Sequence, residues 1–267
     1  NCKMIRGDET MKGLQGKVAV IVGGGRGIGK AIAEQFAKYG STIVIGSRTK
    51  EQVAATVEDI RLQGGTAHGI PLDVTDRASV DVFFKETVEI AKRIDILVYC
   101  AGMNKRIPAE EYPLSAWNEV LTTNLQGAYH CCQEAGKRMI EQKAGAIVTI
   151  TSMLSHVGTP NQSAYAASKG GLLQYSKTLA VEWAKYNIRV NAVSPGYIET
   201  DLTAKNFKNP TFRTAVFGKT PMDRFGEAAE VADAVCFLSS DAASYITGAC
   251  IPVDGGFIAG HPGIVMQ

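Results

Sequence analysis

The stretch KVAVIVGGGRGIG, Lys17 to Gly29, decides the fold of this chain. Its first six residues are a nearly continuous apolar and β-branched run, which predicts a strand buried on both faces. A glycine cluster follows directly, and a helical pattern covers Ile28 to Tyr39. Glycines at such a turn let the backbone bend tightly and approach a phosphate group held at the helix N-terminus. The stretch therefore predicts a strand, a phosphate-binding turn and a helix.

The spacing of these glycines is GxxxGxG, with Gly23, Gly27 and Gly29 in the marked positions. It differs from the GxGxxG dinucleotide fingerprint. A plain tight connection between two elements is the alternative interpretation. The buried strand before the turn and the helix after it favour phosphate binding.

Short apolar runs and helical patterns alternate along the rest of the chain. Further strands are expected at Ser41 to Gly46, Thr66 to Val74, Asp95 to Cys100, Ala146 to Ile150, Ile188 to Val193 and Ala249 to Val253. Further helices are expected at Lys50 to Leu62, Arg77 to Ala91, about Ser115 to Gln142, and Ala228 to Leu238. Another helix is expected to carry Tyr165 and Lys169 and to end at about Tyr186. This order predicts an α/β fold, a Rossmann-like doubly wound parallel sheet of about seven strands with helices on both faces. We expect a single domain over residues 12–267 and an N-terminal tail at residues 1–11.

Composition excludes several classes of function. The chain has 267 residues, a formal net charge of +2, and no basic run longer than Lys105-Arg106, so a nucleic-acid surface is not expected. No apolar stretch approaches the roughly 20 residues of a membrane span, and the polar N-terminus lacks the apolar core of a signal peptide. The six cysteines form no CxxC pair. We therefore expect a cytoplasmic protein with reduced thiols and no metal site.

A candidate acid/base pair lies in the stretch SMLSHVGTPNQSAYAASK, Ser152 to Lys169. Tyr165 and Lys169 are four positions apart, which places them side by side on one helix face. A neighbouring ammonium favours the phenolate, so we expect Lys169 to lower the pKa of Tyr165 and make it a general acid/base. Ser152 follows an apolar strand, where its hydroxyl can hold a substrate oxygen. An ordinary surface pair on a helix is the alternative for the tyrosine and lysine.

With these stretches together, the chain from about Lys12 to Gly256 resembles the short-chain dehydrogenase/reductase family, particularly its gluconate 5-dehydrogenase and polyol dehydrogenase members. The resemblance is carried by the GxxxGIG loop, Asp73-Val74, Ala101-Gly102, Asn124 in a TNL context, Ser152 thirteen residues before Tyr165, YxxxK, and Pro195-Gly196. Two positions depart from the family pattern. Val22 replaces a Thr, and Tyr99-Cys100 replaces Asn-Asn, and both changes remove polar groups that ordinarily brace the strand ends.

The resemblance implies a catalytic set. Tyr165 would protonate the carbonyl oxygen in reduction or deprotonate the alcohol in oxidation. Lys169 would lower the pKa of that phenol and hold the nicotinamide ribose, while Ser152 would orient the substrate oxygen. Asn124 resembles the residue that holds a water in the proton relay from Lys169. From the residues alone, Asn124 is equally a solvated helix asparagine.

The expected cofactor is NADP. An NAD-selective fold has an acidic residue about 20 positions beyond the glycine loop, whereas this chain has Ser47-Arg48 there. Together with Arg26, these residues suit a 2′-phosphate; the alternative is that both arginines face solvent. The cofactor set implied by the resemblance is Gly23, Gly25, Arg26, Gly27, Ile28, Gly29, Ser47, Arg48, Asp73, Val74, Ala101, Gly102, Tyr165, Lys169, Pro195, Gly196, Ile198 and Thr200.

The substrate is expected to be a small polar polyol or sugar acid. Lys105 and Arg106 follow the fourth strand and suit a carboxylate, although a solvated loop is equally consistent with them. Met153, Tyr197 and, less strongly, His156 are further pocket candidates. The segment at about 196–226 has no clear periodicity and is expected to be a substrate lid.

Two other functions remain open. A 3-oxoacyl-thioester (acyl-carrier-protein) reductase shares every motif and needs a basic surface for its carrier. A non-catalytic dinucleotide-binding regulator has no need of the complete set formed by Asn124, Ser152, Tyr165 and Lys169. The resemblance also implies a homotetramer, in which the helix that carries Tyr165 and the long helix before it form a dimer and the C-terminal strand joins dimers into the tetramer.

Overall fold

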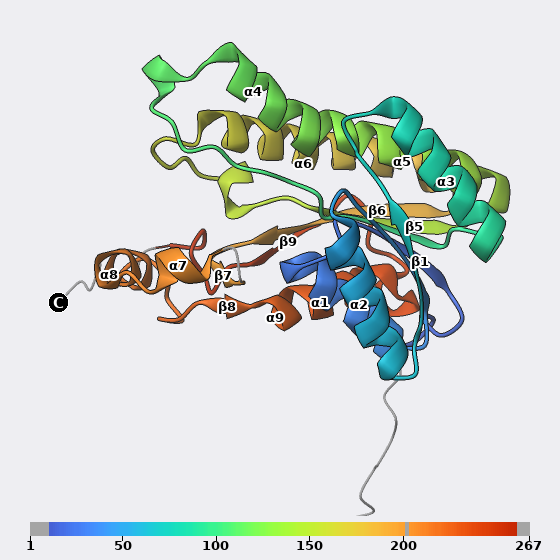
Figure 1. Cartoon of the computed structure of the whole chain (residues 1–267). Helices are drawn as coiled ribbons and strands as arrows, with labels where there is room; N and C mark the ends of the chain where they lie inside the picture. Colours follow the sequence, from blue (N-terminus) through green and yellow to red (C-terminus); the bar gives the residue numbers. More distant parts are fainter. Residues whose placement is uncertain (1–10, 201–202, 261–267) are drawn as a thin grey trace, which may run out of the picture.

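A computed structural model describes residues 11–200 and 203–260 and shows a parallel, seven-stranded central sheet in the order β3-β2-β1-β4-β5-β6-β9 (Figure 1). The strands are β1 (Val18–Val22), β2 (Thr42–Ser47), β3 (Thr66–Pro71), β4 (Ile96–Tyr99), β5 (Gly145–Ile150), β6 (Ile188–Pro195) and β9 (Cys250–Val253). The expected doubly wound sheet is confirmed. Residues 1–10 of the expected N-terminal tail lie outside the described residues.

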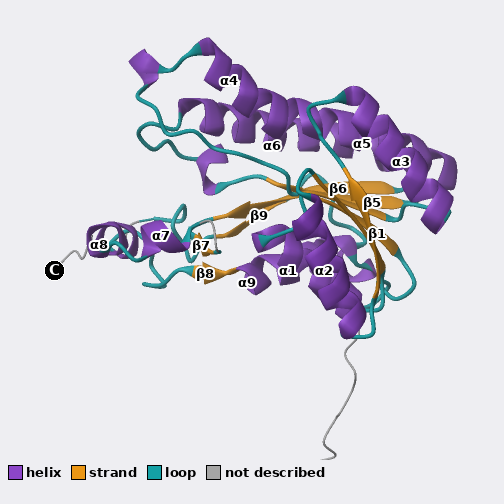
Figure 2. Ribbon diagram, viewed as in Figure 1, coloured by secondary structure: helices purple, strands orange, loops and turns teal. Residues whose placement is uncertain are grey.

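Helices cover both faces of this sheet (Figure 2). On one face lie α3 (Arg77–Ala91), α5 (Gly127–Gln142) and α6 (Ser163–Trp183), and on the other α1 (Gly27–Lys38), α2 (Lys50–Leu62) and α9 (Ala228–Ser239). Side chains of β1 alternate between the two cores: Val18, Val20 and Val22 pack on the α3/α5/α6 side, whereas Ala19 and Ile21 pack on the other. Burial on both faces explains why its sequence is continuously apolar.

The long helix expected at about Ser115 to Gln142 contains a break that the sequence did not indicate. It consists of α4 (Leu114–Leu121), a π-helical turn (Thr122–Gln126) and α5. The Gly127 amide donates to the Thr122 carbonyl, five residues back instead of four. Single π-helical turns inside α-helices occur frequently at functional sites.

The segment between β6 and α9 is more regular than expected. It contains β7 (Ile198–Glu199), α7 (Ala204–Phe207), α8 (Pro210–Phe217) and β8 (Gly226–Glu227), and β7 pairs with β8 in a separate two-stranded sheet. The Asn209 side chain caps α8 by accepting from the Phe212 amide at 3.3 Å, and Pro210 occupies the first turn. These helices have a small apolar cluster of their own, formed by Phe207, Val216 and Phe225.

Among the described residues, no helix is both long enough and apolar enough to cross a membrane.

Candidate active site

A cleft of about 640 Å³ lies at the carboxyl ends of β1, β4, β5 and β6. β1 lies where the strand order reverses, the position at which doubly wound sheets bind ligands. Most of the residues predicted from the sequence line this one cleft: Gly23, Gly25, Arg26, Gly27, Ile28, Gly29, Ser47, Arg48, Val74, Ala101, Gly102, Arg106, Ser152, Met153, Tyr165, Lys169, Pro195, Gly196, Tyr197, Ile198 and Thr200. Asp73, Lys105 and Asn124 are not among its lining residues.

The glycine turn forms a cradle that suits a pyrophosphate. Gly23 has a φ of 86°, and a Cβ added to it would lie 2.7 Å from the Ala101 nitrogen, so a larger residue would block the turn. Helix α1 begins after Arg26, with no side-chain cap and no acidic residue in its first turn. Its N-terminal amides therefore lack a side-chain acceptor, which is the chemistry of a phosphate site.

Three polar side chains surround the far end of this cradle. Ser47, Arg48 and Arg26 line the cleft, and the two arginines are exposed. Among the described residues, neither guanidinium has a carboxylate within 4 Å. This end of the cleft is therefore electropositive and lacks the acidic residue that recognises a ribose 2′-hydroxyl.

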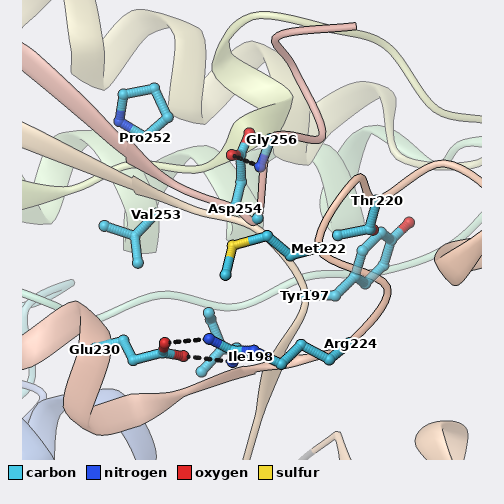
Figure 3. A pocket seen from close by; sticks show the side chains of 12 residues that line it. Tyr197, Ile198, Thr220, Met222, Arg224, Glu230, Pro252, Val253, Asp254 and Gly256 are labelled. Atoms are coloured by element: carbon cyan, nitrogen blue, oxygen red, sulfur yellow. Dashed lines mark hydrogen bonds and ion pairs between the residues drawn. The ribbon is translucent and has the colours of Figure 1, made fainter. Parts of the chain in front are cut away.

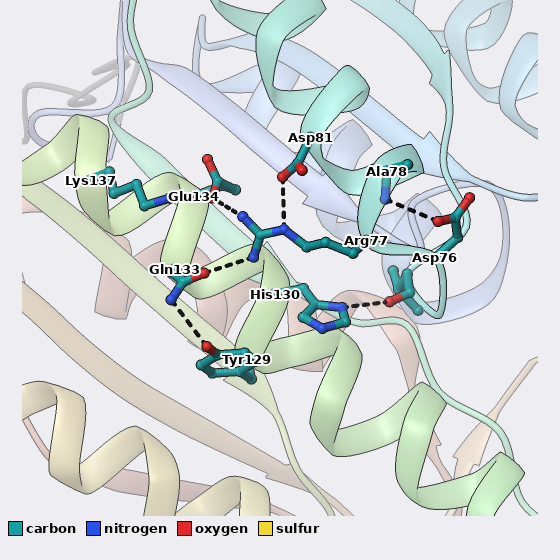
Figure 4. Close-up of polar contacts among 10 residues, drawn as sticks. Asp76, Arg77, Ala78, Asp81, Tyr129, His130, Gln133, Glu134 and Lys137 are labelled. Carbon is teal, nitrogen blue, oxygen red and sulfur yellow. Dashed lines mark hydrogen bonds and ion pairs between the residues drawn. The ribbon is translucent and has the colours of Figure 1, made fainter.

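Val74 lines the cleft, whereas the Asp73 side chain bonds within its own turn. Val74 lines the cleft, and its carbonyl contacts His130 Nδ1 of α5 at 3.3 Å (Figure 4). The Asp73 carboxylate accepts bonds from the Thr75 amide (2.9 Å) and hydroxyl (2.7 Å). Partial burial acts to raise the pKa of Asp73, but these bonds and the nearby Arg48 charge hold it below its ordinary value.

The predicted acid/base residues meet in the middle of the cleft. Lys169 is almost fully buried, donates to the Ile150 carbonyl at 2.7 Å, and lies 5.8 Å from the centre of the Tyr165 ring. Burial lowers the pKa of Lys169 to about 8 and raises the pKa of Tyr165, which its interaction with Ser152 partly offsets. The expected lowering of the Tyr165 pKa is therefore wrong for this structure, because desolvation of the phenol outweighs its hydrogen bond with Ser152.

Asn124 lies behind this centre and is fully buried, which rules out the solvated interpretation. Its Oδ1 accepts from the Met103 amide at 2.8 Å, and its Nδ2 donates to the Met103 carbonyl and the Ser168 hydroxyl, each at 2.9 Å. A Cβ at Gly102 would lie 3.4 Å from Asn124 Oδ1 and 3.5 Å from Lys169 Nζ. Gly102 therefore lies in van der Waals range of both polar groups, which border the same space.

The two adjacent cations at the substrate end point in different directions. Lys105 forms an ion pair with Glu119, whereas Arg106 lines the cleft and has no carboxylate within 4 Å among the described residues. The backbone on both sides of Arg106 is held, because Tyr112 donates to the Lys105 carbonyl at 3.1 Å and the Ile107 amide donates to the Asn161 carbonyl at 3.0 Å. The prediction of a two-cation site is corrected to Arg106 alone, since Glu119 pairs with the other cation.

Tyr197 and Met153 line the same end of the cleft. Burial raises the pKa of Tyr197, and the charge of Arg106 partly offsets this rise, so the two side chains share one environment. His156 does not line the cleft, because its Nε2 contacts the Ser194 hydroxyl at 3.0 Å.

Several lining residues had not been predicted. Phe207 and Phe212 reach the cleft from α7 and α8, and Asn104 and Gln162 hydrogen-bond to each other at its mouth. Aromatic residues in a segment expected to be a lid were a usable signal for Phe207 and Phe212. Nothing in the sequence pairs Asn104 with Gln162, which lies 58 positions away.

A smaller hollow lies beside β7, β8 and β9 and shares Tyr197 and Ile198 with the cleft (Figure 3). Arg224 and Glu230 form a two-point ion pair beside it, with nitrogen to oxygen distances of 2.9 and 2.5 Å. Asp254, on another side, accepts from the Gly256 amide at 2.9 Å. The Arg224–Glu230 pair joins the segment 196–226 to α9, and the Met222 amide, which donates to the Gly255 carbonyl at 3.1 Å, joins the same segment to the chain after β9.

Comparisons with known proteins agree with this geometry. A family model described as enoyl-(acyl carrier protein) reductase matches residues 22–258. The chain is 41% identical over 244 residues to the 3-oxoacyl-[acyl-carrier-protein] reductase FabG of Aquifex aeolicus, covering 91% of this chain and 98% of the relative. Among solved structures, gox2181 superposes with a TM-score of 0.91 at 40% identity, covering 92% of this chain and 97% of that one. A gluconate 5-dehydrogenase from Burkholderia cenocepacia, in complex with NADP and tartrate, superposes with a TM-score of 0.89 at 33% identity, covering 92% and 97%.

Proposed function

Because this chain belongs to the short-chain dehydrogenase/reductase family of oxidoreductases, we propose that it interconverts a secondary alcohol and a ketone with NADP(H), on a small polyol or sugar-acid substrate. The observation that carries the substrate class is Arg106, a cation on a held backbone at the substrate end of the cleft, with no carboxylate within 4 Å in the part of the chain that the structure describes. NADPH, when bound, supplies the hydride.

We assign the proton chemistry to residues in the middle of the cleft. Burial keeps the Tyr165 phenol protonated at neutral pH, which suits it to donate a proton to a ketone oxygen during reduction. The Ser152 hydroxyl orients the same oxygen. Lys169 and Asn124, which both border Gly102, form the path that resupplies the proton. In oxidation the same groups act in the reverse order.

We assign the cofactor to the glycine turn and its surroundings. The free amides of α1 suit a pyrophosphate, and Ser47, Arg48 and Arg26 suit a 2′-phosphate. Val74 borders the adenine position. Ala101, Gly102, Pro195, Gly196, Ile198 and Thr200 border the ribose and nicotinamide positions. The Burkholderia relative, which holds NADP, supports this assignment.

Arg106 suits a substrate carboxylate. A guanidinium binds a carboxylate through two parallel charge-assisted hydrogen bonds. The Burkholderia relative is a gluconate 5-dehydrogenase and holds tartrate, a hydroxy diacid. Asn104 and Gln162 at the mouth add amide groups that suit hydroxyls of a polyol.

A second function is favoured by a different observation. The lid exposes Lys208, Arg213 and Lys219, and no acidic residue occurs between positions 203 and 222. Phe207 and Phe212 also give the cleft an apolar wall. An exposed basic surface beside an apolar wall suits a 3-oxoacyl group delivered by an acidic carrier protein, in line with the FabG relative.

The test is NADPH oxidation by the purified protein with 5-ketogluconate and with an acetoacetyl thioester, each repeated with NADH. We expect turnover of the keto acid with NADPH. Arg106→Met should raise KM for the keto acid about 10- to 100-fold, because a charge-assisted bond contributes about 1.5–3 kcal/mol. Lys105→Met is the matched control and should leave KM nearly unchanged. A rate with the thioester alone would assign the protein to the second function.

Three further predictions accompany this proposal. The segment at about 196–226 acts as a substrate lid within the single domain 12–267. The protein forms a homotetramer, which light scattering would contradict if it gave a monomeric mass. Its location is the cytoplasm.

A further inference from the structure

The side chain of Tyr99, at the end of β4, connects the central sheet to the π-helical turn. It is fully buried, and its hydroxyl donates to the Thr123 carbonyl at 2.5 Å. The sequence had suggested that a tyrosine here would remove a polar group that braces the strand end. This bond shows that the brace is kept, through a longer side chain that reaches the neighbouring helix.

The Tyr99 hydroxyl donates to the Thr123 carbonyl, which in the π-helical turn does not accept from its usual α-helical donor. In an α-helix the Gly127 amide would donate to the Thr123 carbonyl, four residues back. Here that amide donates to Thr122 instead. The Tyr99 hydroxyl thus supplies a donor at the site from which the α-helical amide has been displaced, and it favours the π form over a regular α-helix.

The next residue along the turn is Asn124, the buried side chain behind the catalytic centre. Its three hydrogen bonds, to the two backbone groups of Met103 and to Ser168, depend on where the turn holds its Cα. Relaxation to a regular α-helix would rotate this residue, because a π-helical turn accommodates one more residue than an α-helical turn. Asn124 would then move away from Gly102 and Lys169.

The helix that follows the turn is held in place independently. Arg77 of α3 donates to Gln133 at 2.7 Å and pairs with Glu134, and His130 contacts the Val74 carbonyl (Figure 4). A rearrangement of the turn therefore cannot be absorbed by sliding α5. Gly127 makes room for the bond, since a Cβ there would lie 2.6 Å from the Tyr99 hydroxyl.

We propose that Tyr99 is a positioning residue for the proton path: its hydroxyl holds the π-helical turn so that Asn124 faces Lys169. This inference rests on the proposed function for its activity readout. Tyr99 itself touches neither substrate nor cofactor, because it is enclosed between β4 and the turn.

The test is a double-mutant cycle of Tyr99→Phe with Asn124→Ala, in which kcat and the KM for NADPH are measured. Tyr99→Phe removes one oxygen, and we expect kcat to fall about three- to tenfold with an unchanged KM for NADPH. In the Asn124→Ala background the same change should alter kcat by less than about twofold, because both variants interrupt one path. Thr87→Val is the matched control: its hydroxyl is also buried and donates to a carbonyl, Phe83, at 2.8 Å, but in α3 away from the cleft. It should leave kcat unchanged.

A second variant and a second readout keep the inference testable whatever the first variant does. Gly127→Ala retains the Tyr99 hydroxyl but places a Cβ 2.6 Å from it and 2.8 Å from the Val74 side chain. Its effect through Tyr99 should lower kcat without adding to Asn124→Ala, whereas an effect through Val74, at the proposed adenine position, should raise the KM for NADPH. Hydrogen exchange of the unliganded protein should speed up over residues 122–128 in Tyr99→Phe and not in Thr87→Val. If the wild type had no NADPH turnover, the proposed function would fail, while hydrogen exchange would still decide the role of Tyr99. Wild-type kcat in folded Tyr99→Phe, additive losses in the cycle, or unchanged exchange would each overturn the inference; if Tyr99→Phe does not fold, Gly127→Ala decides it.

Discussion

The floor of the cleft and the segment 196–226, which we propose as its lid, are built in different ways. The floor consists of the carboxyl ends of β1, β4, β5 and β6 together with α6, and its residues belong to the two large cores on either side of the sheet. In the described part of the lid, residues 196–226, Ile198 belongs to one of the large cores, and a separate small cluster is formed by the buried side chains Phe207, Val216 and Phe225. Ser152 and Lys169, on the floor, and Asn124, behind it, are at most 7% exposed, whereas the lid carries exposed Lys208 and Arg213.

This difference in construction indicates that the floor carries out proton transfer and that the lid selects the substrate. Proton transfer requires groups held within hydrogen-bonding distance, and the floor provides them because its groups are fixed by burial and by contacts such as that of Lys169 with the Ile150 carbonyl. Substrate selection tolerates movement, and a lid with its own small core can shift without disturbing the sheet. Each prediction below changes one region and asks whether the other responds.

The largest effect is expected from removing the phenol of the floor. Tyr165→Phe should lower kcat about 10²- to 10⁴-fold, the usual contribution of a general acid, while the Kd for NADPH stays unchanged. Tyr197→Phe removes the same group from the lid side of the cleft and should change kcat by no more than about tenfold, the effect of one neutral hydrogen bond. Stopped-flow turnover and fluorescence titration measure the two quantities. Persistent turnover in Tyr165→Phe would show that another group supplies the proton.

The next effect compares one buried phenylalanine of the large core that supports the floor with one of the lid. Phe36→Ala, in the core under α1, should lower the free energy of unfolding by about 3–5 kcal/mol. Phe225→Ala, which loses its stack on Phe207 at 3.8 Å, should mainly raise the substrate KM and speed proteolysis near α8, because the small lid core opens locally. Urea unfolding and protease mapping separate these outcomes. Equal losses of global stability would show that floor and lid unfold as one unit.

The same contrast explains how far the sequence predicts the structure. Strands such as β1 were predicted because continuous apolar runs bounded by glycine leave few alternatives. Helices α7 and α8 were missed because their stability depends on contacts among Phe207, Phe212 and Phe225, which are not periodic, although Asn209-Pro210 was a readable start signal. The hydrophobic pattern of a sequence predicts which residues are buried in a large core, but it does not predict a small aromatic cluster in a separate segment.

At the site, spacing predicted which side chains meet but not their electrostatics. The four-residue interval brought Tyr165 and Lys169 together, yet the direction of the Tyr165 pKa depends on burial, which spacing does not contain. Glu119 lies 14 positions from Lys105, so only the folded chain shows which of two adjacent cations remains for a substrate. The π-helical turn depends on the Tyr99 hydroxyl 24 positions before Thr123, a contact that local propensity cannot reveal.

The smallest expected effect is the pH dependence of the free energy of unfolding that buried Lys169, on the floor, produces. The pKa of Lys169 falls from 10.5 in the unfolded chain to about 8 in the folded one, with burial as the first cause. Between pH 8 and 10.5 the unfolded chain therefore binds a proton that the folded chain has lost, so this lysine makes the free energy of unfolding rise with pH. From pH 7.5 to 9.5 the wild type should gain about 2 kcal/mol relative to Lys169→Met, measured by urea unfolding of the cofactor-free protein. Lys208→Met, an exposed lid lysine, should follow the wild type at both pH values. If Lys169→Met and the wild type instead gave parallel curves, the Lys169 ammonium would be solvated, and the floor would be as open to water as the lid.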